Sequence, residues 1–206
     1  MQFSARAFVL LVLQQLVVIA ANFGTLVPIR GTAGDIALDE RRNRLYVTNL
    51  AAYRVEVLNL ADRSFAAAMP VAKPPSAVAL SPDGRYLVVG HFDNFPGSTQ
   101  TGGYTIFDLD GGERKDVVMS SPVLAVAFGN GSRALVITAG EALLLDPTTA
   151  VAEPLRLIPS TTGSLPVAFN TFPQKITNAT IGVSGDGNTI VALADSTTAN
   201  LFVRYK

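Results

Sequence analysis

The chain has 206 residues, 49% of them apolar and 16% charged, and its 16 basic and 16 acidic side chains cancel. So much apolar sequence must bury a large core, and the balanced charge lacks the basic surface of a nucleic-acid-binding protein, so no nucleic-acid partner is expected. The chain has no cysteine and a single histidine. This excludes disulfide frameworks, thiolate nucleophiles, zinc ribbons and multi-histidine metal centres, and we predict no metal site and no cofactor.

The amino terminus has the pattern of an export signal. Arg6 precedes residues 7–21, which are apolar apart from two glutamines. This stretch is shorter than the ~17–25 residues of a membrane-spanning helix, and small residues end it, as in secretory signal peptides. We expect residues 1–21 to be removed, leaving 22–206 as a secreted, periplasmic or cell-envelope domain with no integral membrane span. The alternatives are a buried element of the fold and a retained membrane anchor.

Beyond residue 31, a β-hairpin pattern recurs four times. Each unit has an apolar strand, a polar turn rich in Asp, Asn, Gly and Ser, and a second apolar strand, and the units are anchored at Ile36, Val78, Val126 and Ile181. The anchors are about 40–55 residues apart, close to the ~40–50 of four-stranded propeller blades. The sequence predicts an all-β, β-propeller-type domain of about four blades of four-stranded antiparallel sheets, starting near residues 35, 77, 125 and 180.

The outer strands of these blades are expected in the intervening segments. The third and fourth strands are predicted at residues 53–59 and 65–71, 104–109 and 114–119, and 142–146 and 152–158, and the fourth unit has a third strand at 201–205. Residues 24–30 look like an orphan strand that takes the place of the missing fourth one. The first strands read large, small, large, and the second strands are apolar on both faces, as expected for sheets covered on both sides.

Two strings in the hairpins resemble a known repeat family. RLYVTN at residues 44–49 and SPDGRYL at 81–87 are similar to the motifs of YVTN-family β-propeller repeats, bacterial relatives of WD40-type blades. The resemblance covers about residues 32–206 and implies an exported propeller, typically of seven blades. The wider group includes lactonases and quinoprotein dehydrogenase subunits, but no motif outside the structural repeat matches, so no catalytic residue is carried over.

The number of blades departs from the family, because this chain holds fewer than four complete ones. It is interpreted as part of a seven-bladed propeller, as a small four-bladed ring completed by residues 24–30, or as a chain that pairs with another copy. An open arc would expose apolar blade faces and unpaired strand edges, which favours self-association through those edges.

Two long polar connections, residues 92–103 and 159–179, are predicted at the same end of the blades. Long loops on one face of a propeller are typical of binding sites. The candidate ligand-binding residues are His91, Asp93, Asn94, Gln100, Asn170, Gln174 and Lys175. His91 could equally be a hydrogen-bonded residue at a strand end, and Asp93 and Asn94 could shape a turn.

The predicted function is a secreted binding or interaction scaffold that uses the face bearing these loops. Its partner is expected to be a protein, a glycan or a cell-envelope component. The alternative is a lactonase-like hydrolase or a quinoprotein-dehydrogenase-like subunit with His91 and Asp93 near the centre of that face. Residues 108–113 are read as a turn rather than a calcium loop, and Arg41, Arg42 and Arg44 as a solvated basic cap.

Overall fold

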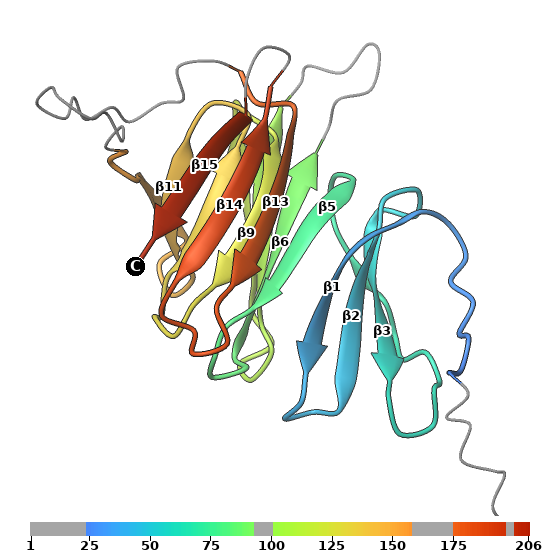
Figure 1. Ribbon diagram of the computed structural model, residues 1–206. Helices are drawn as coiled ribbons and strands as arrows, with labels where there is room; N and C mark the ends of the chain where they lie inside the picture. The colour runs from blue at the N-terminus through green and yellow to red at the C-terminus, as the bar shows by residue number, and fades with distance from the viewer. Residues whose placement is uncertain (1–23, 93–100, 158–174, 197–199) are drawn as a thin grey trace, which may run out of the picture.

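The computed structural model describes residues 24–92, 101–157, 175–196 and 200–206. These residues form 15 strands in four antiparallel sheets, and each sheet is built from strands that follow one another in the chain (Figure 1). Three sheets have four strands, and the last has three. We call the sheets the first to fourth blades, in chain order.

The strands have the following bounds. The first blade contains β1 (Ala33–Asp39), β2 (Arg44–Asn49), β3 (Arg54–Asn59) and β4 (Met69–Pro70). The second contains β5 (Pro75–Leu80), β6 (Tyr86–Phe92), β7 (Gly102–Asp108) and β8 (Arg114–Met119). The third contains β9 (Val123–Phe128), β10 (Ala134–Thr138), β11 (Ala142–Asp146) and β12 (Val151–Pro154). The fourth contains β13 (Asn178–Val183), β14 (Ile190–Asp195) and β15 (Asn200–Tyr205).

The polar turns between first and second strands have a repeated local structure. In the turn after β5, Ser81 Oγ donates to Asp83 Oδ1 (2.5 Å) and accepts the Tyr86 amide (2.8 Å), and Gly84 has a φ of 70°. The turn after β13 makes the same bonds with Ser184, Asp186 and Thr189 (2.6 and 3.0 Å). Glycine fits the left-handed position in both turns because it has no Cβ. The Ser-x-Asp-Gly string is therefore the cause of the hairpin at these two places.

Consecutive blades pack face to face, and the large–small–large pattern of the first strands explains how. The small residues Ala37, Ala79 and Ala127 lie in the clusters shared with the next blade, whereas Val78 and Val126 lie in the clusters shared with the previous one. We call these two sides the forward and backward faces. Each buried contact therefore joins the small residues of one first strand to the large residues of the next.

The structure confirms an all-β, β-propeller-type fold. The second strands of the first three blades are largely buried on both faces, as their composition predicts. The turn at residues 108–113 is also confirmed, because Asp108 Oδ1 accepts the amides of Asp110 and Gly111 at 3.1 and 2.8 Å.

Residues 24–30 depart from the prediction. They form no strand and lie beside the first blade, where Asn49 Nδ2 donates to the Arg30 carbonyl at 2.7 Å. The prediction that they complete the fourth blade of a small ring is therefore wrong. In Figure 1 the first and fourth blades lie at opposite ends of an open arc.

The outermost strands are shorter than predicted. Strand β4 covers Met69–Pro70 rather than residues 65–71, and Phe65 makes only an isolated bridge with Leu58. Strand β12 ends at Pro154 rather than at residue 158. Both strands end at a proline, although the amides of the next residues, Val71 and Leu155, still donate to the carbonyls of Tyr53 and Ala142 at 2.9 and 2.8 Å.

The described residues contain no helix with the length and apolar character needed to cross a bilayer. The predicted signal segment, residues 1–21, lies outside the described residues.

Candidate functional site

The end of the arc from which the two long connections leave is held together by hydrogen bonds; we call it the loop end. At the end of β6, the Phe92 amide donates to the Pro74 carbonyl just before β5 (3.0 Å). Ser76 Oγ then donates to the Val123 carbonyl of the third blade (2.8 Å). The point where residues 93–100 leave the second blade is thus fixed to the third.

A second set of bonds continues this rim towards the fourth blade. The Ala139 amide, just after β10, donates to the Pro122 carbonyl (3.1 Å), and the Ile176 amide donates to the Ala139 carbonyl (2.9 Å). The side chain of Ile176 is buried between the third and fourth blades. Both long connections therefore start or end on one hydrogen-bonded rim.

The structure describes only two of the predicted ligand-binding residues. Asp93, Asn94, Gln100, Asn170 and Gln174 lie outside the described residues. Lys175 is exposed at the loop end, directly before the buried Ile176. His91 lies inside β6 rather than in the loop that follows it.

His91 is buried, with 3% of its surface exposed, and Thr105 of β7 is its hydrogen-bonding partner. Thr105 Oγ1 lies 3.0 Å from His91 Nε2 and donates to Asp116 Oδ1 at 2.5 Å. Because a hydroxyl has one hydrogen, the histidine must donate, which places a hydrogen on Nε2. The alternative reading of His91 as a hydrogen-bonded strand residue describes this arrangement.

Burial lowers the pKa of His91 to about 4. The carboxylate of Asp116 opposes this shift, and the cations Lys73 and Arg114 add to it. The imidazole is therefore neutral at physiological pH. Its Nε2 is hydrogen-bonded to Thr105, and the ring has little contact with solvent.

The opposite end of the arc, formed by the turns between first and second strands and between third and fourth strands, is the turn end. Here Arg42 lies between the first and second blades: Nη1 donates to Asp39 Oδ2 (2.8 Å) and to the Gly84 carbonyl (2.6 Å), and Nη2 bonds Asp110. Arg41 also bonds Asp110 and the Asp83 carbonyl. The expectation of a solvated cap is wrong for Arg42, which clamps two blades together over a fully buried Asp39.

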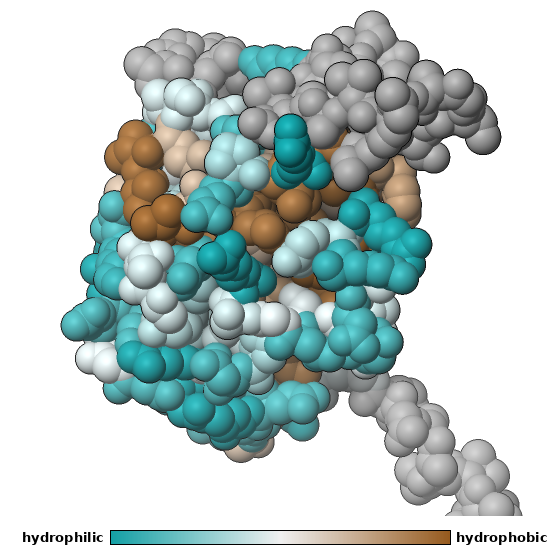
Figure 2. All heavy atoms as spheres, turned by 90° about the vertical axis from the view of Figure 1, so that its left-hand side faces the viewer, coloured by the Kyte–Doolittle hydropathy of each residue, from teal (hydrophilic) through white to brown (hydrophobic). Residues whose placement is uncertain are grey.

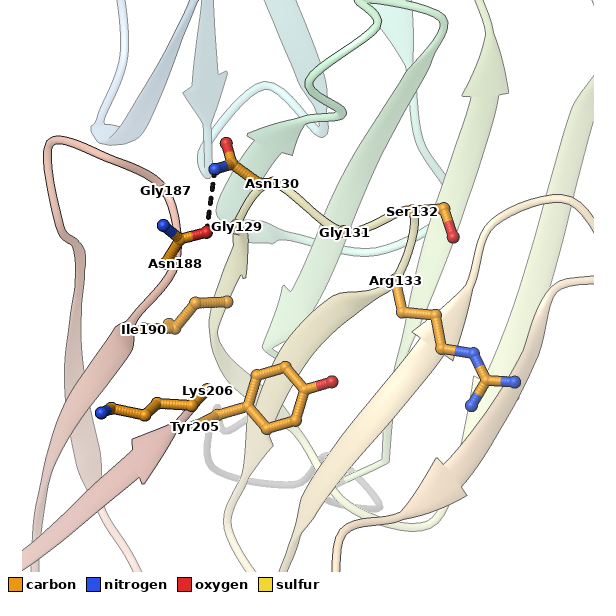
Figure 3. Close-up of a pocket in the computed structure, with 10 residues that line it drawn as sticks. All are labelled: Gly129, Asn130, Gly131, Ser132, Arg133, Gly187, Asn188, Ile190, Tyr205 and Lys206. Carbon is orange, nitrogen blue, oxygen red and sulfur yellow. Dashed lines mark hydrogen bonds between the residues drawn. The ribbon is translucent and has the colours of Figure 1, made fainter.

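The third and fourth blades meet at the turn end through an equivalent contact. The Asn130 amide donates to the Gly187 carbonyl (2.8 Å), and its side-chain Nδ2 donates to Asn188 Oδ1 (3.2 Å). Figure 3 shows these residues beside a hollow of about 330 Å³ into which Ile190 and Tyr205 also project. In both contacts a polar residue of one turn donates to the glycine carbonyl of the next.

The two ends differ in surface character. Figure 2, which looks onto the side of β11 and β15, shows apolar surface gathered towards the loop end and hydrophilic surface at the turn end. Among the described residues, no three His, Asp or Glu side chains lie close enough together to hold a metal ion.

Sequence reasoning missed the role of the turn end in joining the blades. The sequence could have indicated it by position: Arg42 and Asn130 lie in the first turns of their blades, and the corresponding turns of the next blades contain Gly84 and Gly187. Their partners are backbone carbonyls, which no side-chain motif reveals.

Comparison with known proteins supports the fold and little beyond it. No protein-family model matches the chain. A curated relative, Antigen Lp49 of Leptospira interrogans, is 34% identical over 59 residues, which is 29% of this chain and 13% of that protein.

Two solved structures are similar over most of the chain. Hydrazine synthase of Kuenenia stuttgartiensis matches with a TM-score of 0.61 and 16% identity, covering 87% of this chain and 48% of that chain. The β-propeller domain of Cps50 (Swd1) from Myceliophteria thermophila matches with a TM-score of 0.56 and 16% identity, covering 83% and 51%. The chain thus has the fold of a β-propeller and spans about half the length of each.

Proposed function

We propose that this chain is a secreted bacterial propeller module of the YVTN type that binds a protein, a glycan or a cell-envelope component at its loop end. The observation that carries the proposal is the hydrogen-bonded rim, to which the flanks of both long connections are anchored. Such an arrangement presents loop residues from different blades on a rigid support, which is how propellers and other scaffolds display binding loops.

The comparisons are compatible with this role. Antigen Lp49 is named as an antigen, which is compatible with exposure outside the cell, and the Swd1 domain is a β-propeller. The hydrolase or quinoprotein alternative gains no support from His91, because the imidazole is buried and bonded to Thr105.

Loop exchange tests the proposal. The full chain would be compared with a variant in which residues 93–100 and 159–173 are replaced by short Gly-Ser linkers, using glycan arrays, peptidoglycan and purified outer-membrane vesicles. We expect binding to at least one of these probes, lost at least about tenfold on loop replacement. Asn130→Ala at the turn end is the matched control and should bind as the parent does.

Two outcomes contradict the proposal. One is no binding to any probe by the folded parent. The other is binding that survives loop replacement but is lost in the turn-end variant, which would move the site to the opposite end of the arc.

A further inference from the structure

The first and fourth blades each expose large apolar side chains on a face that is covered in the blades between them. Each face also carries a charged residue, Glu56 in the first blade and Arg204 in the fourth. On the backward face of β1, Ile36 and Leu38 are 61% and 51% exposed, whereas the equivalent Val126 and Phe128 of β9 are 3% and 8% exposed. Ile36 and Leu38 therefore occupy positions that, in the third blade, are buried against the preceding blade.

The forward face of the fourth blade is the complementary half of such a contact. Leu193 of β14 and Phe202 of β15 lie opposite each other in the register and are 47% and 67% exposed. In the third blade, the forward-facing Leu135 and Ile137 are fully buried against the fourth. Gly182 holds the small position of β13, as Ala37, Ala79 and Ala127 do in the other first strands.

The fourth blade also has an open strand edge. In the first three blades the third strand pairs with a fourth, but within the described residues β15 pairs with β14 alone. The unpaired backbone groups of an edge strand are a template for strand addition.

In the order of the sequence, residues 24–30 occupy the position at which a preceding blade would have its outermost strand. In this chain each first strand is directly preceded by the outermost strand of the previous blade: β4 precedes β5, β8 precedes β9, and β12 precedes β13. Residues 24–30 precede β1 in the same way and are tied to the first blade through Asn49. Leu26 in this segment is 97% exposed.

We propose that two copies of this chain close into one eight-bladed ring. The forward face of each fourth blade packs on the backward face of the other copy's first blade, and residues 24–30 of each copy add to β15 of the other as its fourth strand. A two-fold axis relates the two identical contacts and leaves no blade face uncovered. Eight blades lie within the ~4–8 of known propellers, and the chain spans about half of the propeller-containing chains it matches.

The first test is the mass in solution. The full chain, purified after export and with its mature terminus identified by mass spectrometry, is expected to have twice the mass of one chain by light scattering. Phe202→Glu should raise the dimer dissociation constant at least about tenfold, because it places a charge in the contact. Val118→Glu is the matched control: Val118 is 76% exposed on β8, the outermost strand of the second blade, and lies on neither of the two faces that form the proposed contact, so its substitution should leave the dimer unchanged.

Engineered cysteines test the register, since the chain has no cysteine of its own. In the contacts within the chain, Ala79 of the second blade and Val126 of the third share one cluster. The equivalent pair across the proposed contact is Gly182 and Ile36 of the other copy. A chain carrying Gly182→Cys and Ile36→Cys should form a covalent dimer under oxidising conditions, whereas Ile36→Cys with Val118→Cys should not.

Hydrogen exchange tests the added strand. Amides of residues 24–30 should be protected in the parent and lose protection in folded, monomeric Phe202→Glu. A folded parent that stays monomeric overturns the proposal and assigns the apolar faces to further blades of a longer polypeptide. A series of oligomers larger than the dimer in light scattering overturns the closed ring. Rapid hydrogen exchange of the amides of residues 24–30 in a dimer overturns the strand exchange.

Discussion

At the scale of single residues, Gly90 lies where the second blade packs closely against the third. A Cβ on Gly90 would lie 2.5 Å from Cγ1 of the fully buried Val123. Gly90→Ala should therefore lower the free energy of unfolding by about 1–3 kcal/mol, through overpacking. Urea denaturation measures this, with Gly140→Ala as control because its Cβ would meet nothing nearer than 3.8 Å. Equal losses in the two variants would contradict a role for the close contact.

His91 makes a second prediction, for the pH dependence of stability. Its pKa in the folded chain is about 4, below the ordinary 6.5, so the unfolded chain binds more protons between these values. The stabilisation is complete above about pH 6.5 and is lost as the pH falls towards 4, with about 2 kcal/mol lost by pH 5. His91→Gln retains a donor for Thr105 and should show a smaller loss between pH 7 and pH 5. An unchanged pH profile would mean that His91 is not the group responsible.

At the scale of elements, the turns join the blades as well as the strands within them. Arg42→Ala would leave the carboxylate of Asp39 buried with its ion pair removed, so we expect a loss of about 3–5 kcal/mol in the free energy of unfolding. Arg133→Ala is the control, because Arg133 and Glu153 form an exposed pair worth at most about 1 kcal/mol. Thermal or urea unfolding would distinguish them, and a loss no larger for Arg42 than for Arg133 would refute the clamp.

The elements also show which parts of the fold the sequence predicts. The Ser-x-Asp-Gly turns and the doubly apolar second strands were identified correctly because their bonds and burial depend on residues close in sequence. Residues 24–30 were misjudged, because an extended apolar segment reads as a strand whether or not a partner edge lies beside it. Strand counting predicts that the two long connections leave the same end of the blades, and the described flanks of both do lie at one end. The burial of His91 was not foreseen, because it depends on the third strand of its own blade, which its local sequence does not contain.

At the scale of the whole molecule, each blade is stabilised mainly by its neighbours in the chain. In such an array, terminal units open before internal ones. In the monomeric Phe202→Glu chain, amides of β14 should therefore exchange faster than those of β6 and β10, which are covered on both faces. Hydrogen exchange with mass spectrometry checks this order, and uniform exchange across the three strands would show that the arc unfolds as one unit instead.

The alternation of large and small residues in the first strands gives the fold a direction. A blade copied and inserted between two others would meet a small residue on one side and a large one on the other, as the second and third blades do. The same sheet inserted the other way round would set large against large and small against small. Duplication of whole blades therefore keeps small side chains packed against large ones at every contact between blades. A propeller of this kind can gain blades by unequal recombination without further substitutions in its core.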